Sequence, residues 1–194
     1  MPQVSTAWDG GWWRKAERCE SPNCGPRPSR VEVSLALIHS ISLPPGEYGG
    51  DAIERFFTNR LDWDAHPYFA TIRGMAVSAH FLIRRDGRTL QFVSTELRAW
   101  HAGNSSWQGR ANCNDYSVGI ELEGVEGELF EPAQYACLVR LLKALARRFP
   151  LAAVAGHEHV AAGRKGDPGA GFDWPRLVSS LRWPLAMFPH EGLA

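Results

Sequence analysis

The clearest regular pattern in the sequence is the segment 131–149, EPAQYACLVRLLKALARRF, which predicts a long helix. Pro132 falls in its first turn, where a missing N–H costs nothing, and Pro150 ends it. A predicted strand, YSVGIELEG at 116–124, precedes the helix, and a short strand near 152–155 follows it. A chain that passes from strand to long helix to strand is expected to pack the helix against a sheet.

Three more strands are predicted upstream. In the segment 30–40, RVEVSLALIHS, every second residue is expected on one face of a strand, and a histidine is the last of them. The residues on this face are Val31, Val33, Leu35, Leu37 and His39. The segment 76–94, AVSAHFLIRRDGRTLQFVS, predicts a hairpin around the Asp86-Gly87 turn. The total is about five strands.

Two shorter helices complete the prediction. DAIERFFTNRL at 51–61 has Asp51 and Glu54 at capping-box spacing. DWPRLVSSLRW at 173–183 has Asp173 in the N-cap position. Strands and helices follow each other in a mixed order, so we expect an α/β (mixed) fold with one central mixed β-sheet flanked by helices.

The chain has 194 residues, which fits one domain with one core. We expect an N-terminal arm at 1–29, rich in Pro, Gly, Cys and Trp and packed on the domain, then the main domain at 30–183 and a tail at 184–194. Lys plus Arg equals Asp plus Glu, so the formal net charge is zero and nothing resembles the basic footprint of a nucleic-acid-binding protein. No apolar run has the length of a membrane span, so a membrane partner is not expected either.

The N-terminus lacks the charged and apolar regions of an export signal, and the four cysteines form no recognisable disulfide framework. A cytoplasmic location is therefore expected, where thiols stay reduced. We expect a monomer.

The segment 156–169, GHEHVAAGRKGDPG, places two histidines, a lysine and an aspartate in a glycine-rich stretch. His39 lies at the end of its strand, and His157 follows the short strand near 152–155. With Asp167 they would make two imidazoles and one carboxylate, a typical catalytic zinc set that leaves the fourth position for water. Spacing alone does not separate His157 from His159, because residues two apart on an extended chain face the same way.

Six segments together carry a resemblance to a known family: LIHS, HPYFA, VSAHFLIRRDG, RAWHAGNSSWQGR, CNDYSVGIELEG and GHEHVAAGRKGDPG. Their order and spacing over roughly residues 8–178 resemble the zinc N-acetylmuramoyl-L-alanine amidases of the amidase-2 class, which share a fold with peptidoglycan-recognition proteins. The nearest pattern is the cytosolic AmpD type, which cleaves 1,6-anhydro-N-acetylmuramoyl peptides during cell-wall recycling. The resemblance implies a hydrolase with a small-molecule muropeptide as its substrate.

Residue by residue, the resemblance implies that His39, His157 and Asp167 hold zinc. It implies that Glu121, the first glutamate of ELEG, is the catalytic glutamate and that Lys165 is the catalytic lysine. In that chemistry the glutamate transfers the proton of the attacking water to the leaving amine, while the lysine and the metal stabilise the oxyanion. Glu123 shares the strand face of Glu121 and is the rival for its role.

Other residues in the matched segments are expected to line the cleft and meet the substrate, namely Trp100, His101, Asn104 and Arg110, with His80 close by. The alternative for Trp100 is a core tryptophan, and His66 is as well explained by structure as by function. The chain departs from the family pattern at Ser40, His159, Ala162 and Gly166. The arginines that meet the diaminopimelate carboxylate in relatives fall at Ala76 and Asn112, so weaker discrimination at the peptide end is expected, with Arg73 and Arg110 as the nearest replacements.

Two other functions remain open. An amidase with the same chemistry could act on intact murein, as an endolysin-like or periplasmic enzyme does. A non-catalytic peptidoglycan-recognition module would use the same fold, but such modules typically lose a metal ligand, whereas all three ligand positions, Glu121 and Lys165 are intact here.

Overall fold

The computed structural model describes residues 7–189, so the first six residues of the expected arm and residues 190–194 of the expected tail lie outside the described residues. The strands are β1 (Trp8–Asp9), β2 (Trp12–Trp13), β3 (Glu17–Arg18), β4 (Cys24–Pro26), β5 (Leu35–Ile41), β6 (Phe81–Ile83), β7 (Thr89–Gln91), β8 (Leu97–Ala99), β9 (Ser106–Trp107), β10 (Arg110–Ala111), β11 (Ser117–Glu123) and β12 (Ala153–Gly156). The α-helices are α1 (Ala52–Phe57), α2 (Pro67–Thr71), α3 (Pro132–Ala146), α4 (His157–Val160) and α5 (Trp174–Leu181), with 3₁₀ turns at Cys113–Asp115 and Leu185–Met187.

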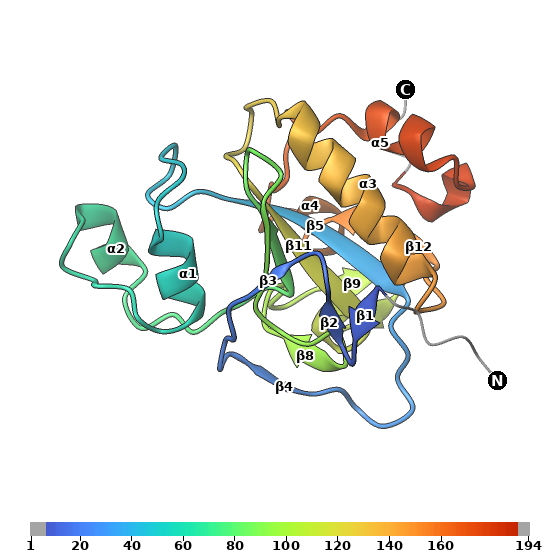
Figure 1. Ribbon diagram of the computed structural model, residues 1–194, viewed down its shortest axis with the longest axis horizontal. Coiled ribbons are helices and arrows are strands. Elements are labelled where there is room, and N and C mark those ends of the chain that lie inside the picture. The colour runs from blue at the N-terminus through green and yellow to red at the C-terminus, as the bar shows by residue number, and fades with distance from the viewer. Residues whose placement is uncertain (1–6, 190–194) are drawn as a thin grey trace.

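Within the described residues the main sheet has six strands in the order β12-β5-β11-β6-β7-β3. β12, β5, β11 and β6 are parallel neighbours, and β7 runs antiparallel to β6. The predicted mixed sheet flanked by helices is confirmed (Figure 1). The prediction of about five strands missed β3, a two-residue strand of the N-terminal segment that pairs with β7.

β5 and β11 form the centre of the sheet and pair over seven residues. The strand predicted from residue 30 begins only at Leu35, because Leu35 is the first residue opposite the start of both neighbours, Ser117 of β11 and Ala153 of β12. Along β11, alternate side chains face opposite sides, as the sequence predicted. Val118 and Ile120 are fully buried in the core beneath α3.

One face of the sheet is covered by α3 and α5, which lie side by side (Figure 1). α3 buries an apolar stripe that includes Leu138, Leu141 and Leu145 against the sheet. Pro132 occupies its first turn, and the Asp173 side chain caps α5 by accepting from Arg176 N, both as predicted. This face of the sheet is therefore closed off by packed helices.

The opposite face is covered by short elements, among them α1 and α2. The capping box predicted for α1 does not form: Asp51 makes no capping hydrogen bond, because its carboxylate accepts from Arg55 Nε at 2.7 Å. Glu54 pairs instead with Arg84 after β6. The prediction also missed α2, which His66 caps by accepting from Tyr68 N, with proline in the first turn as the overlooked signal.

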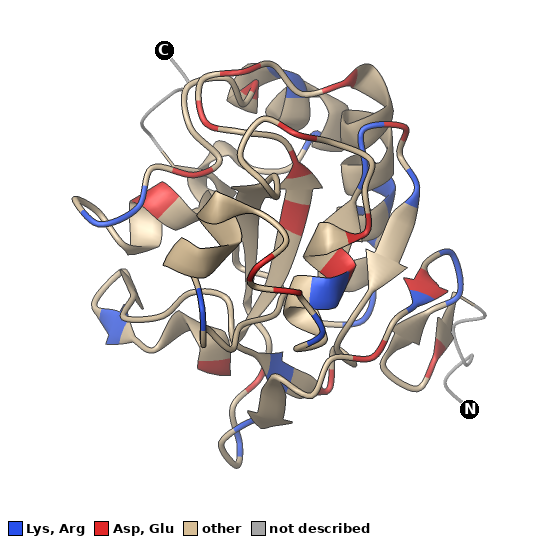
Figure 2. Cartoon of the chain, turned by 90° about the vertical axis from the view of Figure 1, so that its left-hand side faces the viewer, with Lys and Arg blue, Asp and Glu red and all other residues tan. Residues whose placement is uncertain are grey.

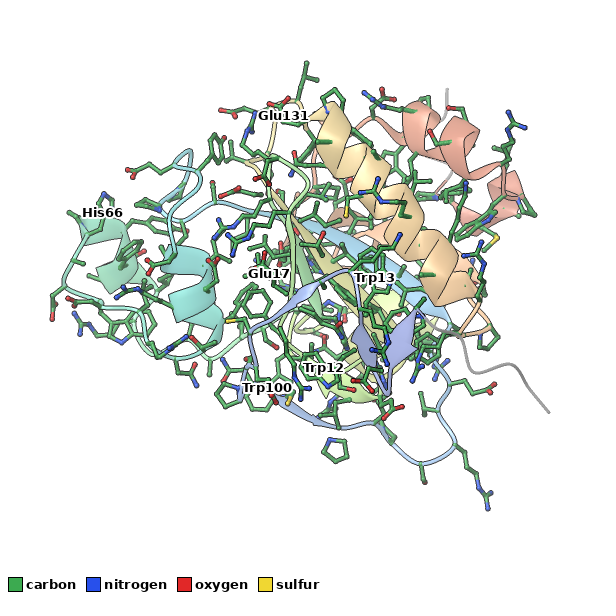
Figure 3. The ribbon with its side chains drawn as sticks, viewed as in Figure 1. Trp12, Trp13, Glu17, His66, Trp100 and Glu131 are labelled. Carbon is green, nitrogen blue, oxygen red and sulfur yellow. The ribbon has the colours of Figure 1, made fainter. Side chains whose placement is uncertain are left out.

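The N-terminal segment contacts the sheet at several points. Trp13, labelled with Trp12 in Figure 3, is buried with its ring edge-on against Phe81, and its backbone N–H donates to Gln91 Oε1 at 2.7 Å. Arg27 donates to four backbone carbonyls, those of Thr95, Asn114, Asp115 and Ser117. At the other end of the chain, Phe188 is buried in the main core.

Basic and acidic residues are interspersed over the elements (Figure 2). None of the helices between residues 7 and 189 is both long and apolar enough to cross a bilayer.

Candidate active site

Three side chains converge where parallel strands end. His39 lies near the end of β5, His157 follows the last residue of β12, and Asp167 lies on the loop after α4. His39 Nδ1, His157 Nδ1 and Asp167 Oδ2 form a triangle in which every pair is 3.1 Å apart. Such a cluster of buried donor atoms could hold a metal ion.

The outer nitrogens of both imidazoles have partners that turn their Nδ1 atoms toward the cluster. His157 Nε2 lies 3.1 Å from the carbonyl oxygen of Ala102, and only an N–H can bond a carbonyl. His39 Nε2 lies 2.9 Å from His101 Nδ1. A proton on Nε2 leaves the Nδ1 lone pair free to bind a metal ion.

The protonation states of the cluster residues are also compatible with metal binding. Burial raises the pKa of Asp167, but its close contacts with the imidazoles of His157 and His39 outweigh that effect and hold the pKa well below its usual range. Burial lowers the pKa of His39, so its imidazole stays neutral more readily. A carboxylate and neutral imidazoles are the protonation states that metal binding needs.

Glu121 of β11 is the direct register partner of His39 on β5, and the two residues face the same side of the sheet. Its side chain is buried, and within the described chain its Oε2 atom has no hydrogen-bond partner. Burial, helped by the negative charge of Asp167, raises the pKa of Glu121 well above its ordinary value. A buried carboxyl group with a free oxygen and a raised pKa is suited to proton transfer.

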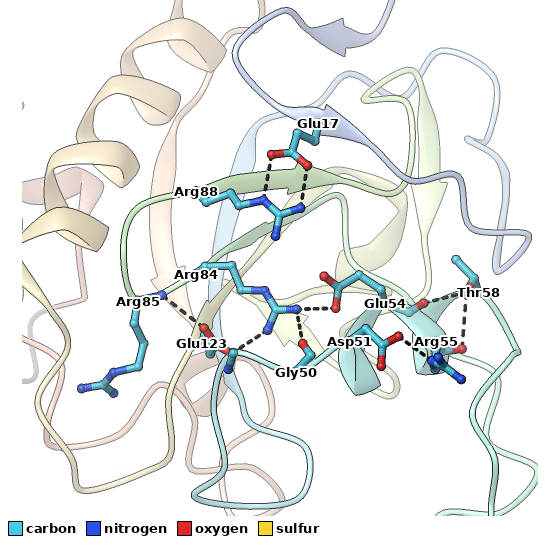
Figure 4. A network of polar contacts seen from close by, with 11 residues as sticks. Glu17, Gly50, Asp51, Glu54, Arg55, Thr58, Arg84, Arg85, Arg88 and Glu123 are labelled. Atoms are coloured by element: carbon cyan, nitrogen blue, oxygen red, sulfur yellow. Dashed lines mark hydrogen bonds and ion pairs between the residues drawn. The ribbon is translucent and has the colours of Figure 1, made fainter.

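Glu123, two residues further along β11, has a different environment (Figure 4). Its Oε1 accepts from Arg84 Nη1 at 2.5 Å and from Gly49 N at 2.7 Å, while Oε2 accepts from Arg85 N at 3.2 Å. It is not among the described residues that line the cleft. This geometry favours Glu121 over Glu123 as the glutamate that meets a substrate.

The cluster opens into a cleft of about 410 Å³, lined by His39, Glu121, His157 and Asp167, with Lys165 and Trp100 also on its wall. Lys165 is exposed, and Trp100 exposes 38% of its surface, so the core alternative for Trp100 is not supported. Trp100 lies beyond the end of β8, and Figure 3 marks its position. Of the predicted substrate-binding residues, only Trp100 and His101 therefore reach the cleft.

The sequence prediction missed the apolar end of the cleft, formed by Leu43, Phe56, Tyr68, Ile72, Met75 and Val77. Tyr68 and Met75 are large apolar residues with exposed surfaces, at 36% and 47%. For the part of this wall at 68–77, YFATIRGMAV, the available signal was the high share of apolar residues without strand alternation. An apolar wall beside the cluster gives a substrate a surface to pack on.

Two predicted substrate-binding residues lie outside the cleft. The carbonyl oxygen of Asn104 accepts from Arg164, and the guanidinium of Arg110 stacks 3.8 Å from the ring of Tyr116. His80 is also behind the cleft, because its Nδ1 accepts from Gly119 N at 3.0 Å. Neither Asn104 nor Arg110 is among the described residues that line the cleft, so their expected contacts with substrate have no support from the geometry.

His159 lies apart from the cluster. Its Nδ1 accepts from Gly156 N at 2.9 Å, and its ring lies edge-on to Trp174 at 5.5 Å. Of the two histidines, the geometry therefore favours His157 as a metal ligand, because His157 supplies the clustered nitrogen.

A family model and individual relatives assign the chain to the same family. The model of the amidase-2 family, described as N-acetylmuramoyl-L-alanine amidase, matches residues 29–170. The 1,6-anhydro-N-acetylmuramyl-L-alanine amidase AmpD of Salmonella typhimurium (strain SL1344) is 49% identical over 187 residues, which are 95% of this chain and 98% of that protein.

Solved structures agree with the sequence comparison. A crystal structure of a selenomethionine derivative of AmpD superposes with a TM-score of 0.87 at 49% identity, covering 89% of this chain and 98% of that one. The amidase AmiD of E. coli, solved with the substrate anhydro-N-acetylmuramic acid-L-Ala-D-gamma-Glu-L-Lys, gives a TM-score of 0.57 at 28% identity, covering 79% of this chain and 60% of that one. By its sequence, its fold and the extent of both matches, the chain belongs to the N-acetylmuramoyl-L-alanine amidase family.

Proposed function

We propose that this chain is a zinc-dependent hydrolase that cleaves the amide bond between 1,6-anhydro-N-acetylmuramic acid and the L-alanine of muropeptides in peptidoglycan recycling. The name of its Salmonella relative and the substrate bound to E. coli AmiD support that substrate class. The observation that carries the proposal is one cleft in which a triangle of metal-binding atoms lies beside a buried, unpaired carboxyl oxygen.

The triangle fits zinc. Ligand atoms bound at 2.0–2.1 Å to a tetrahedral zinc ion are roughly 3.3 Å apart, close to the observed 3.1 Å spacing. His39, His157 and Asp167 would hold the ion. Bound there, zinc supplies a Lewis acid and lowers the pKa of water to about 7.

Glu121 acts as the general base and then as the general acid. Its free Oε2 accepts a proton from the attacking water and returns it to the leaving amine of L-alanine. Burial, which raises its pKa, brings the carboxyl group closer to the neutral range where both transfers are efficient.

Lys165 stabilises the negative charge that develops on the carbonyl oxygen. It is mounted on the loop between α4 and Asp167, and its backbone N–H donates to Ala161 O at 3.1 Å. Its ammonium group provides a compact positive charge at the cleft wall. Trp100 and the apolar end of the cleft bind the sugar or the peptide through their exposed surfaces.

The enzyme acts as a cytoplasmic monomer on a soluble muropeptide in this proposal. The test is incubation of the purified protein with 1,6-anhydro-N-acetylmuramoyl tripeptide, in parallel with intact murein, followed by mass spectrometry. We expect free tripeptide and anhydro-sugar from the soluble substrate, and none with metal-free protein. Release from murein at a comparable rate would favour the endolysin-like alternative, and no cleavage of either substrate would overturn the proposal.

A further inference from the structure

Two consecutive residues, His101 and Ala102, lie behind both candidate ligand histidines. The His101 side chain is the partner of His39 Nε2, at 2.9 Å, and the Ala102 carbonyl oxygen is the partner of His157 Nε2, at 3.1 Å. One short segment after Trp100 therefore orients both imidazoles from the side opposite the cluster.

The proton positions along this chain of contacts follow from hydrogen-bond chemistry. If His39 presents an Nδ1 lone pair to a metal ion, its proton is on Nε2, which then donates to His101 Nδ1. His101 must then carry its own proton on Nε2, which lies 3.2 Å from Ser117 Oγ. Both ring nitrogens of His101 thus have protein partners, so a direct hydrogen bond to substrate is not its role.

The segment is held firmly in place. Asn114 Oδ1 accepts from the backbone N–H groups of both His101, at 3.1 Å, and Ala102, at 2.8 Å. The His101 ring packs flat on β11 at Gly119, where an added Cβ would come within 2.5 Å of the ring. The ring also meets His39 edge-on, with centroids 5.0 Å apart.

We propose that His101 is a positioning residue that fixes the tautomer and orientation of His39, and that Asn114 holds the His101–Ala102 segment for both ligand histidines. The inference rests on the proposed zinc site and adds to it an outer layer. Outer partners of metal-binding histidines are most often carboxylates, backbone carbonyls or water. His157 follows that pattern, whereas His39 uses a second imidazole.

The test measures zinc affinity by competition with a chromophoric chelator, so it does not depend on catalysis. His101→Leu keeps much of the side-chain volume but removes the acceptor, and it should weaken zinc binding about 10–100-fold. His101→Asn places an amide oxygen near the position of Nδ1 and should restore affinity to within about tenfold of the wild type. Asn114→Ala should weaken binding, and Asn114→Asp, which keeps an acceptor, should not.

The controls separate positioning from general damage. His66→Leu changes the histidine that caps α2, which is not in the cluster, and should leave zinc affinity unchanged. Thermal unfolding of the metal-free variants reports whether each one is folded. If the wild-type protein binds no zinc, the proposed metal site fails together with this inference. If the wild type binds zinc and folded His101→Leu binds equally well, or if Leu and Asn variants lose affinity equally, the inference alone is wrong.

Discussion

Glu121 and Glu123 are the same residue type on the same strand face, two positions apart, yet they lie in different environments. Glu123 is bonded to Arg84, Gly49 and Arg85 in a network that ties β11 to α1 and to the turn after β6 (Figure 4). Glu121 lies beside the candidate metal-binding cluster, and within the described part of the chain one of its oxygens has no hydrogen-bond partner. Glu123 is thus tied into the structure, while Glu121 is left available for the proton transfer that we propose.

The comparison shows that burial alone does not decide the role of a carboxyl group. Both side chains are buried, at 8% exposure for Glu121 and 2% for Glu123. What differs is whether a fixed cation and backbone N–H groups satisfy the oxygens. A buried carboxyl without such partners costs stability, which a functional site can tolerate when the rest of the fold is well packed.

His157 and His159 are likewise the same residue type in different environments, and their substitution should give the largest difference, in zinc binding. His157→Ala should abolish zinc binding at stoichiometric metal, because a zinc site with one of three protein ligands removed loses most of its affinity. His159→Ala should retain one zinc per chain, since His159 bonds Gly156 instead. Metal analysis of both purified variants measures this. Zinc retained in His157→Ala and lost in His159→Ala would show that the wrong histidine was assigned.

Removing the partner of Arg84 should destabilise the fold substantially. Glu123→Ala leaves a buried guanidinium with only Glu54 as its ion-pair partner in the network, so a loss of about 3 kcal/mol in the free energy of unfolding is expected. The matched control is Glu17→Ala, which breaks the exposed pair with Arg88 and should cost less than about 1 kcal/mol. Denaturant titration of the two variants compares them, and equal costs would contradict the structural role of Glu123.

Whereas Glu123 is expected to stabilise the fold, Glu121 should destabilise it, and this cost should grow as the pH rises. Between its ordinary pKa of 4.5 and its raised folded-state pKa, the folded protein keeps a proton that the unfolded chain has lost. Metal-free wild type should therefore lose stability relative to Glu121→Gln as pH rises through this window, by up to about 1.4 kcal/mol per pH unit. The two proteins should differ least below pH 4.5. A stability difference that stays constant between pH 4 and pH 7 would contradict the raised pKa.

The smallest effect is expected at the peptide end of the substrate. Arg73 pairs with Asp64 and Arg110 stacks on Tyr116, both away from the cleft lining. Arg73→Ala and Arg110→Ala should each change the ratio of kcat/KM for tripeptide and dipeptide anhydro-muropeptides by less than about fivefold. A larger change in either variant would place that arginine at the diaminopimelate carboxylate.

Much of the scaffold was predictable because its signals are local. The alternation along β11, the Asp86-Gly87 hairpin and the proline at the start of α3 were each predicted from neighbouring residues, and each forms. The capping box of α1 failed because Glu54 has a long-range partner, Arg84, that the sequence pattern does not reveal.

The finer choices within the site depend on three-dimensional neighbours. His157 and His159 were expected to face the same way on an extended chain, but α4 begins at His157. Two residues along a helix point about 200° apart, so only one histidine reaches the cluster. The choice between Glu121 and Glu123 likewise needed the position of Arg84, and the contact of His101 with His39 crosses 62 positions in the sequence.

The rate of anhydro-muropeptide hydrolysis by zinc-loaded Glu121→Gln and Glu123→Gln tests the division of roles most directly. Both variants should bind one zinc per chain, because neither side chain belongs to the clustered ligands. Glu121→Gln should lower kcat by on the order of 10²–10⁴, since the amide cannot accept the proton of water. The kcat of Glu123→Gln, measured on its folded fraction, should stay within about tenfold of the wild-type kcat, because an amide oxygen can still accept from Arg84. An inactive Glu123→Gln beside an active Glu121→Gln would contradict the assignment of Glu121 as the proton-transfer residue.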